Sequence, residues 1–513
     1  MPGDSPTVAE ILRHQARARG DHPLLVCDDD RISYAEADRR SAELARGLIA
    51  WGGGKGTHVG LLYPNGTDFV VGMLAAARIG AVVIPFSTFV TAREMREQLV
   101  DGDVEILLAA ASFRSHDYMQ RLADVLSHAE LDSDERLFVS ATPQLRHVAV
   151  NPERLCRLAQ AVDPALLAAM EDDADGCDPL AIVYTSGSTD TPKGVVHTHA
   201  ALLGHQRNLN EIRGLTAADK LFCNSPFFWI GGFAFGLLAT LVAGSTLVCS
   251  NATDAGQTLD LLEAEKPTIT NGFAAGIAHL ADHPSFAGRD LSSMRRGNLY
   301  PIMSPTARPA DPELRHNMLG LTEAGSVVLI SDNESDQPES RRGSFGKPAP
   351  GFQTMIIDPD SSGVGELCIR GPYLMQGYHK RSREECFDAD GWFHTGDLVR
   401  GDAEGFFYFV GRLGAMIKTA GANVSAAEVE KAIVKVTGAE AHVVGIPDAE
   451  RGELVAAVVA QPDLDETAVR ERLKAELSAY KIPKRFIALP RAEVPLLSSG
   501  KVDMRQLRKL FDA

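Results

Sequence analysis

The sequence predicts an α/β fold in two domains. The large N-terminal domain has layered, mostly parallel sheets with helices plus a β-rich segment, and the C-terminal domain is a small α+β unit. Helices alternate with short apolar strands over the first 110 residues, the length of 513 residues allows two to four domains, and the pattern changes after residue 411. We therefore place the large domain at residues 1–411 and the small domain at residues 412–513.

The first 110 residues are typical of βαβ units. Ser33 and Glu36 form a capping box for a helix that stops at Gly52. Thr91 and Glu94 cap another helix in the same way. The remaining elements expected here are a strand at 59–63, a helix at 68–79, a strand at 81–86 and a strand at 104–110. Such alternation implies a largely parallel sheet that is covered on both faces.

Two later stretches have unusual composition. The acidic run EDDADGCD at 171–178 is interpreted as solvated surface, because its spacing does not support a metal site. Residues 227–249 carry no charge over 23 residues, which is long enough to span a bilayer. The four glycines in this stretch and the break at Gly244-Ser245 instead favour a buried helix followed by a strand.

The chain after residue 411 forms a unit of its own. Ser425 and Glu428 cap a helix at 426–436. Further expected elements are strands at 442–446 and 454–460, a helix at 466–477 and a Lys/Arg-rich tail at 481–509. This order predicts a small α+β domain of about 100 residues.

Composition excludes several functional classes. The net charge of −17 argues against a nucleic-acid partner, because phosphate backbones attract basic surfaces. The seven cysteines lie far apart without metal-ligand spacing, so we expect free thiols in a reducing compartment. The first residues carry no secretory signal pattern. We expect a cytoplasmic protein with no membrane span.

The most informative stretch is YTSGSTDTPKGVVHTH at 184–199. It follows the apolar end of a strand and combines small and hydroxyl residues with Lys193, which lies between Pro192 and Gly194. Small residues allow successive backbone N–H groups to point at one anion. The stretch is not a Walker loop, which needs Gly-Lys-Ser/Thr after a glycine and four residues. It predicts a phosphate-binding loop of another kind.

This loop closely resembles the phosphate loop of adenylate-forming enzymes, which include acyl-CoA synthetases, luciferases and peptide-synthetase adenylation domains. Other stretches match the family in the expected order: NSPFFWIGG at 224–232, GLTE at 320–323, GELCIRGPYLMQGY at 365–378, GWFHTGDL at 391–398, GRLGAMIKTAGANVSAAEVE at 411–430 and PLLSSGKVD at 495–503. Each motif alone is weak or moderate, but the ordered set is strong and spans nearly the whole chain.

The resemblance implies that a carboxylic acid is activated by attack on the α-phosphate of ATP. Two anions approach each other in this step, so positioning and charge neutralisation carry most of the catalysis. The implied catalytic residues are Lys501, which bridges the α-phosphate and the carboxylate, Lys193 at the β- and γ-phosphates, and Glu323 at Mg²⁺. The implied nucleotide-binding residues are Thr185, Ser186, Gly187, Ser188, Thr189, Leu319, Gly320, Thr322, Asp397 at the ribose hydroxyls and Arg412 beside it.

A mobile C-terminal domain also follows from the resemblance. After adenylation this domain is expected to rotate about residues 412–414, with Gly414 as the hinge, and to withdraw Lys501. The edge that includes Gly421 would then meet the pantetheine arm of coenzyme A. The implied cofactors are ATP, Mg²⁺ and coenzyme A.

The sequence departs from the family pattern at four places. Asp190 replaces a glycine in the phosphate loop, Leu319 stands where an aromatic ring usually stacks on adenine, and Gly414 replaces a charged hinge residue. The stretch RRGNLYPIMSPTARP at 295–309 replaces a Gly-Gly-Ala-Pro segment. We expect Asp190 to point outward, because a carboxylate roughly 6 Å from a phosphate costs on the order of 3 kcal/mol.

Phe228, Trp229 and Phe233 lie beside two glycines and are interpreted as an apolar wall for the acyl group, with an aromatic core helix as the alternative. No acidic residue stands between residues 227 and 235 to hold an α-ammonium group, so an amino-acid substrate is not expected. A bulky hydrophobic acid, whether aromatic, alicyclic or fatty, fits better.

The sequence thus predicts an acid–thiol ligase. It would convert a bulky hydrophobic carboxylic acid and ATP, with Mg²⁺, to acyl-AMP and pyrophosphate and then transfer the acyl group to coenzyme A. One alternative is an enzyme that hands acyl-AMP to a separate ligase or an acyl carrier protein. Another, from a different class, is a degenerate nucleotide-binding protein. A luciferase-like oxidation and a homodimer both stay open.

Overall fold

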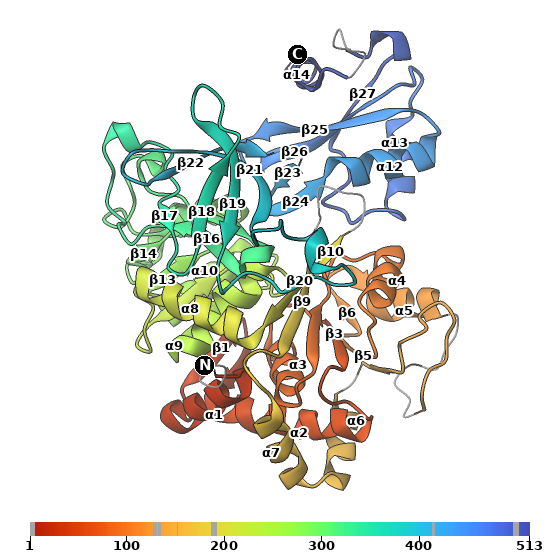
Figure 1. Cartoon of the computed structure of the whole chain (residues 1–513), viewed down its shortest axis with the longest axis vertical. Helices are drawn as coiled ribbons and strands as arrows, with labels where there is room; N and C mark the ends of the chain where they lie inside the picture. The colour runs from red at the N-terminus through yellow and green to blue at the C-terminus, as the bar shows by residue number, and fades with distance from the viewer. Residues whose placement is uncertain are drawn as a thin grey trace. The chain divides into compact units, whose positions relative to one another are not determined.

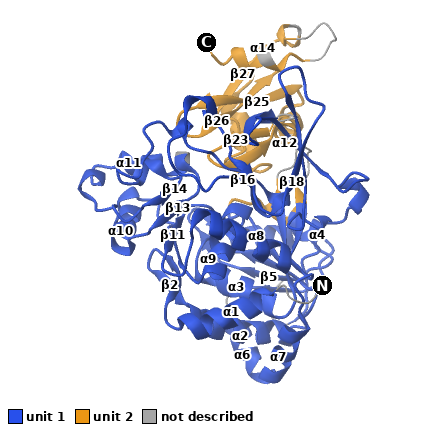
Figure 2. Ribbon diagram, turned by 60° about the vertical axis from the view of Figure 1, so that its left-hand side comes forward, with its two compact units in different colours: residues 1–88, 98–184, 194–411 blue, residues 89–97, 185–193, 412–513 orange. Residues whose placement is uncertain are grey.

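The computed structural model describes residues 6–126, 131, 135–150, 152–185, 192–412, 416–495 and 502–512. The chain divides into two compact units (Figure 2). Unit 1 comprises residues 1–88, 98–184 and 194–411, and unit 2 comprises residues 89–97, 185–193 and 412–513. The mixed α/β architecture with parallel sheets, predicted from the sequence, is confirmed.

The first sheet of unit 1 is mostly parallel. Its described strands are β3 (His58–Leu62), β4 (Val82–Pro85), β5 (Ile106–Ala109), β8 (His147–Ala149), β9 (Pro179–Thr185), β10 (Lys193–Thr198) and β20 (Gly377–Tyr378). Their order is β20-β10-β9-β4-β3-β5-β8. Strand β3 pairs in parallel with β4 and β5, and β20 runs antiparallel to β10. The short strands predicted at 59–63, 81–86 and 104–110 are therefore central strands of a buried sheet.

The helices of the N-terminal part are labelled in Figure 1. They are α1 (Val8–Arg19), α2 (Tyr34–Ala50), α3 (Thr67–Arg78), α4 (Ala92–Asp101), α5 (Tyr118–Leu126), α6 (Glu153–Leu158) and α7 (Pro164–Asp173), and a short hairpin of β6 (Ser112–Phe113) and β7 (His116–Asp117) precedes α5. The hydroxyl of Ser33 accepts a hydrogen bond from the Glu36 amide at 3.1 Å, which is one of the two bonds of the predicted capping box. Helix α3 packs against β3 and β4, and α2 packs over α3.

The second sheet of unit 1 is also parallel except at one edge. Its described strands are β1 (Pro23–Cys27), β2 (Asp30–Ser33), β11 (Lys220–Cys223), β12 (Thr246–Cys249), β13 (Ile269–Asn271) and β14 (Arg296–Gly297), in the order β14-β13-β11-β12-β1-β2. Helices α8 (His199–Arg213), α9 (Ala239–Ala243), α10 (Ala255–Glu265) and α11 (Ala278–Ala281) belong to this part of the chain. Among the described strands of this sheet, only β1 and β2 pair antiparallel.

The uncharged stretch at 227–249 folds as a buried helix and a strand, as predicted. A π-helix, η2 (Gly231–Leu238), continues into α9 and is followed by β12. Gly244 ends α9 with a left-handed φ of 72°, which a glycine adopts without steric strain. Among the described residues, none of the helices has the length and apolar character needed to cross a membrane.

The interpretation of the acidic run at 171–178 as solvated surface is wrong for its first residue. Glu171 is buried, and its carboxylate accepts from Arg78 Nε at 2.5 Å and from Arg13 at 3.0 Å. Two cationic partners offset the desolvation of this carboxylate, so the residue can lie inside the fold. The rest of the run agrees better with the prediction, since Asp172 and Asp173 are exposed.

The β-rich segment forms two antiparallel sheets around a second apolar core. The described strands are β15 (Leu319–Leu321), β16 (Ser326–Ile330) and β17 (Lys347–Pro348) in one sheet, and β18 (Gln353–Ile357), β19 (Val364–Arg370), β21 (Phe393–Gly401) and β22 (Phe407–Arg412) in the other. This segment contains the GLTE, GELCIRGPYLMQGY and GWFHTGDL motifs, so the chemistry predicted for them depends on how these strands are paired.

Unit 2 is an α+β unit. Its strands are β23 (Met416–Thr419), β24 (Ala422–Ser425), β25 (Ala441–Asp448), β26 (Gly452–Val459) and β27 (Arg485–Ala488), and its helices include α12 (Ala426–Thr437), α13 (Glu466–Leu473) and α14 (Met504–Lys509). The Ser425 hydroxyl caps α12 by accepting from the Glu428 amide at 3.3 Å, as predicted. Helix α13 ends at Leu473 instead of 477, because the Lys474 amide already bonds the carbonyl of Glu471 and tightens the last turn.

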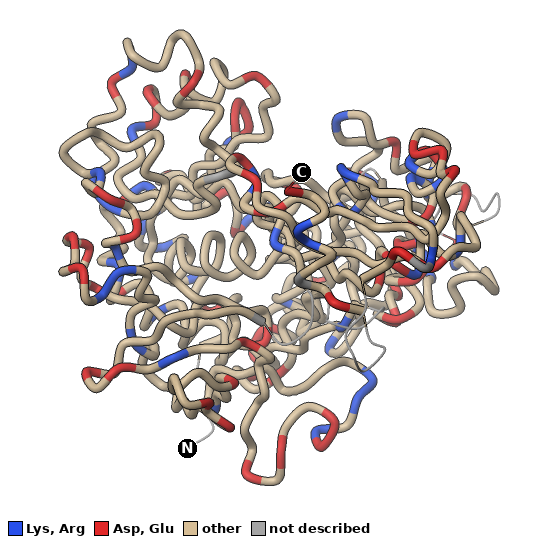
Figure 3. Tube along the Cα trace, turned by 90° about the horizontal axis from the view of Figure 1, so that it is seen from above, with Lys and Arg blue, Asp and Glu red and all other residues tan. Residues whose placement is uncertain are grey.

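Charged residues are spread along the chain. Acidic and basic segments are interspersed along the trace (Figure 3), so the excess of acidic side chains behind the net charge of −17 is not confined to one segment. All seven cysteines are described, and all are free thiols, as expected from their spacing.

Candidate active site

Glu323 lies on the turn of a β-hairpin in unit 1. Strands β15 and β16 pair antiparallel, and a 3₁₀ turn at Thr322–Ala324 joins them. The Glu323 side chain is 8% exposed, and one of its carboxylate oxygens accepts a hydrogen bond from the Tyr378 hydroxyl at 2.7 Å. The Met375 amide donates to the Glu323 carbonyl at 2.9 Å. The carboxylate is thus held in one orientation by a segment more than 50 residues further along the chain.

Sequence reasoning missed Tyr378, because the stretch that contains it was recognised only as part of the β-rich segment. Tyr378 lies on β20 and is the register partner of Val195 on β10, the strand that follows the phosphate loop. This pairing brings a residue from the GELCIRGPYLMQGY motif to the GLTE motif. The one sequence signal that could have suggested Tyr378 as a partner of Glu323 is its hydroxyl, a hydrogen-bond donor at the end of the GELCIRGPYLMQGY motif.

The residues around Glu323 fit a magnesium ion. Mg²⁺ prefers oxygen ligands, and it is commonly bound by one or two carboxylates together with substrate phosphates. Glu323 supplies a carboxylate that Tyr378 fixes through one oxygen. In the family to which the motifs point, such an ion neutralises charge on the phosphates of ATP, and Glu323 is the residue that would hold it.

Buried histidines of β10 and α8 support the hairpin turn. His197 Nε2 donates to the Thr322 carbonyl at 2.7 Å, and His205 Nε2 donates to the Val327 carbonyl at 2.9 Å. Among the described residues, the Nδ1 atoms of both rings have no hydrogen-bond partner. Burial lowers the pKa of each ring to about 4, so both imidazoles are neutral at pH 7.

We expect the free energy of unfolding to decrease as the pH falls from about 6.5 to 4, because His197 and His205 must stay neutral in the fold while the unfolded chain takes up protons. Each ring can contribute a slope of up to roughly 1.4 kcal/mol per pH unit in this window. The H197Q variant keeps a donor for the Thr322 carbonyl and should lose one such contribution.

Urea unfolding at several pH values measures this slope. The matched control is H14Q, which changes an exposed histidine and should leave the slope as in the parent protein. An H197Q slope equal to that of the parent protein would contradict the assignment of His197 as a buried neutral ring.

The Glu323→Gln variant should lower kcat/KM by about 10- to 100-fold, because a neutral amide coordinates Mg²⁺ more weakly than a carboxylate. Tyr378→Phe leaves the carboxylate and removes only its hydrogen bond, so a loss of less than about tenfold is expected. Raising the magnesium concentration should partly rescue Glu323→Gln and should not affect Tyr378→Phe. Equal losses without magnesium rescue would indicate that Glu323 only supports the turn.

Asp397 lies on a bulged part of β21. It is 4% exposed, and its amide donates to the Thr395 hydroxyl at 3.0 Å. The Thr395 hydroxyl in turn donates to the Leu367 carbonyl at 2.6 Å, and the Gly396 amide donates to Glu366 at 2.8 Å. The Thr-Gly-Asp segment is therefore bonded to β19 at Thr395 and at Gly396.

The remaining predicted residues differ in what the structure shows. Thr185 ends β9, Lys193 begins β10, Gly320 lies on β15 and Leu319 packs in the apolar core of the β-rich segment. Gly421 lies in the turn between β23 and β24 with a left-handed φ of 83°, which suits a glycine in a tight hairpin. Those outside the described residues are Ser186, Gly187, Ser188, Thr189, Asp190, Gly414 and Lys501, together with the side chain of Arg412.

The aromatic residues predicted for the acyl wall separate into two environments. The rings of Phe228 and Trp229 lie 5.3 Å apart, and Trp229 meets Phe273 edge-on at 6.1 Å. Phe273 is 37% exposed although it is a large apolar residue. Phe233 is instead fully buried in the core against Phe69, which agrees with the alternative of an aromatic core helix for this residue.

Backbone features keep this aromatic group in place. The Asn224 side chain bonds both the amide and the carbonyl of Phe273, at 3.0 and 3.1 Å. A Cβ atom on Gly232 would lie 2.1 Å from the Pro226 carbonyl oxygen, so a side chain cannot be accommodated there. The segment enters the π-helix η2 at Gly231, two residues after Trp229. Helices of this type are rare and occur frequently at functional sites.

Known proteins resemble the chain over nearly its whole length. The AMP-binding enzyme family matches residues 12–379, and the AMP-binding enzyme C-terminal domain matches residues 428–501. A methyl-dioxo-octahydro-indenyl-propanoyl:CoA ligase of Mycobacterium tuberculosis is 32% identical, covering 99% of this chain and 100% of the relative. A feruloyl-CoA synthase of Amycolatopsis is 30% identical and covers 94% of each chain. The solved structure of the o-succinylbenzoate CoA synthetase of Bacillus subtilis has 24% identity, a TM-score of 0.77 and 97% coverage of each chain, and therefore the same fold.

Proposed function

Because the chain belongs to the AMP-binding enzyme family and is an AMP-forming acid–thiol ligase, we propose that its substrate is a bulky hydrophobic carboxylic acid. One observation carries this proposal. Phe228, Trp229 and Phe273 form an aromatic group in which Trp229 is half-buried and Phe273 is 37% exposed, beside a stretch from 227 to 235 that contains no charged residue. Such a surface favours apolar rings and offers no partner for an ammonium group.

The first half-reaction would use the residues of the predicted motifs. The acid attacks the α-phosphate of ATP and releases pyrophosphate. Asp397 would accept hydrogen bonds from the ribose hydroxyls. Lys193 would contact the β- and γ-phosphates of ATP, and Lys501 would offset the repulsion between the substrate carboxylate and the α-phosphate. Glu323, oriented by Tyr378, would hold Mg²⁺.

The second half-reaction would transfer the acyl group to the thiol of coenzyme A. The thiol attacks the mixed anhydride of acyl-AMP, and AMP leaves. We propose that residues 412–513 act as a mobile lid on a large domain of residues 1–411, with the hinge near 412–414 and Gly421 near the pantetheine arm. The tight turn at Gly421 supports this role, since a glycine has no side chain to keep a ligand away from its backbone.

The printed names of two relatives support a ring-containing acid. One relative is named for a propanoate attached to a fused bicyclic ring, and the other for ferulate. Both acids combine a short carboxylate-bearing chain with a ring. An aromatic wall suits such a ring through stacking or edge contacts.

A panel of acids tests the proposal. Ring-containing propanoates and propenoates, fatty acids and amino acids are each incubated with ATP and Mg²⁺, with and without coenzyme A, and acyl-AMP, pyrophosphate and acyl-CoA are measured by mass spectrometry. We expect acyl-CoA from the ring-containing acids and no product from amino acids. The Trp229→Ala variant should raise KM for these acids about tenfold or more and leave KM for ATP within about twofold.

The other outcomes have definite meanings. Preference for amino acids or short polar acids would overturn the proposal. Accumulation of acyl-AMP with no thioester in the presence of coenzyme A would favour transfer to a separate ligase or carrier protein. ATP binding without pyrophosphate release from any acid would favour a degenerate nucleotide-binding protein.

A further inference from the structure

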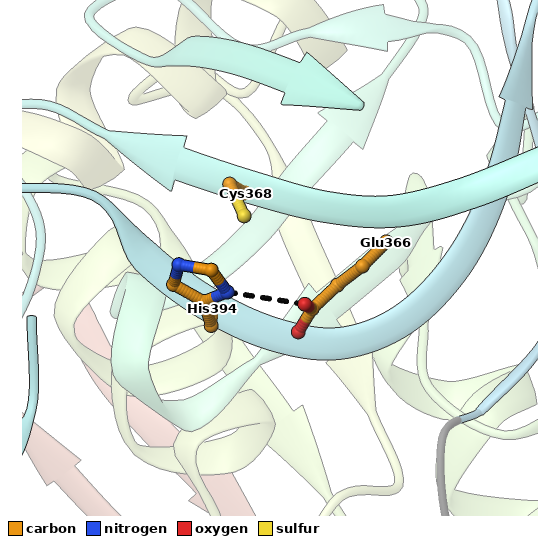
Figure 4. Close-up of side chains that lie close together, drawn as sticks. All are labelled: Glu366, Cys368 and His394. Carbon is orange, nitrogen blue, oxygen red and sulfur yellow. Dashed lines mark hydrogen bonds and ion pairs between the residues drawn. The ribbon is translucent and has the colours of Figure 1, made fainter. Parts of the chain in front are cut away.

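Three side chains with metal-binding donors meet between β19 and β21 of unit 1 (Figure 4). They are Glu366, Cys368 and His394, and their ligand atoms all lie within 4.8 Å of one another. Glu366 and Cys368 are two residues apart on β19, so their side chains lie on the same face of the sheet. Cys368 is the direct cross-strand partner of His394.

A bulge in β21 brings the glutamate to the histidine. Cys368 pairs with His394, whereas Glu366 pairs with Leu398, so the two strands are out of step between these pairs. The extra backbone turns at Gly396, which has a left-handed φ of 72°. As a result, Glu366 Oε2 lies 3.1 Å from His394 Nδ1, while Glu366 Oε1 accepts from the Gly396 amide at 2.8 Å.

A fourth residue lies beside the imidazole on its other side. Asp388 Oδ2 lies 3.6 Å from His394 Nε2. The other oxygen of Asp388 is fixed by the amides of Asp390 and Trp392, at 3.0 and 2.8 Å. A carboxylate beside the second ring nitrogen is the usual companion of a metal-bound histidine, because it favours the tautomer whose first nitrogen is free to bind the ion.

We propose that Glu366, Cys368 and His394 form a binding site for one thiophilic divalent cation of the zinc class. A carboxylate, a thiol and an imidazole are together the donor set of zinc sites, whereas Mg²⁺ and Ca²⁺ prefer oxygen alone. The Nδ1–Oε2 separation of 3.1 Å is close to the roughly 3.3 Å between two ligands of a tetrahedral zinc ion. The site is separate from the proposed magnesium residue Glu323 and does not rest on the proposed function.

The cluster can be reached by an ion from solvent, and its three donor groups can all bind that ion. The His394 side chain is 45% exposed, so an ion can reach the cluster from solvent, while Cys368 is buried at its base. Binding releases the thiol proton of Cys368 and replaces the hydrogen bond between His394 and Glu366 by two metal–ligand bonds. Three protein ligands leave one coordination position for water or a further ligand.

Cobalt binding to the full-length protein tests the proposal. We expect one equivalent of Co²⁺ to give a thiolate-to-cobalt charge-transfer absorption, which an equivalent of Zn²⁺ removes and a large excess of Mg²⁺ does not. Cys368→Ser should abolish this absorption, and His394→Gln and Asp388→Asn should each weaken binding by about tenfold or more.

The control is Cys386→Ser, which changes another buried thiol of the same unit and should keep the absorption. Circular dichroism and a second variant, Cys368→Ala, separate loss of the site from loss of the fold. A parent protein without the thiolate absorption would overturn the proposal, and so would an unchanged absorption in a folded Cys368 variant.

Discussion

The Lys501→Ala variant should form acyl-AMP from acid and ATP about 10²–10³-fold more slowly, yet form acyl-CoA from supplied acyl-AMP at nearly the parent rate. The charge of this lysine is needed while the carboxylate and the α-phosphate approach, since their repulsion is largest at that stage. In the second half-reaction a thiol attacks an anhydride that already exists. Lys501, in the Ser499-Gly500-Lys501 stretch of the proposed lid, would by then have been withdrawn.

Pyrophosphate release and thioester formation, measured separately, check this expectation. Lys509→Ala is the matched control, because it removes an exposed lysine at the end of α14 and should leave both steps unchanged. Equal loss of both half-reactions in Lys501→Ala would contradict the alternating-domain mechanism. Loss of neither would show that Lys501 takes no part in either half-reaction.

The Lys481→Met variant should lower the free energy of unfolding by about 3–5 kcal/mol. In unit 2, the Lys481 ammonium donates to Glu94 at 2.9 Å and to Glu428 at 2.8 Å, and the three side chains are only 7–12% exposed. Burial lowers the pKa of Lys481, but the neighbouring anionic groups outweigh this effect and the net shift is upward. Removal of the ammonium would leave two carboxylates close together without the cation that both of them contact.

The control for Lys481 is another lysine–glutamate pair of the same unit. Lys435 contacts Glu476 at 2.8 Å, but its side chain is 61% exposed. Lys435→Met should therefore change stability by less than about 1 kcal/mol, because exposed ion pairs are screened by water and salt. If urea unfolding gave similar losses for both variants, the buried cluster would not contribute as proposed.

The sequence by itself determined the local structure and the family. Capping residues such as Ser33 and Ser425 set helix starts through contacts with residues three positions away, and the short apolar strands between helices indicate a parallel sheet. Glycine placed the end of α9 at residue 244, because few other residues adopt a left-handed φ without strain. The ordered motifs then indicated the adenylate-forming family. Each of these signals lies within a few neighbouring residues of the sequence, or in the order of short motifs along the chain.

Only the tertiary structure decided which distant side chains meet. Tyr378 reaches Glu323 because β20 pairs with β10, and Glu171 is buried because Arg78 of α3 lies opposite it. His394 meets Glu366 because a bulge shifts the register of β21 by more than one residue. These contacts depend on strand order, register and packing between segments far apart in the chain. Local periodicity does not specify them, since it fixes the face on which a side chain lies but not its partner on the neighbouring element.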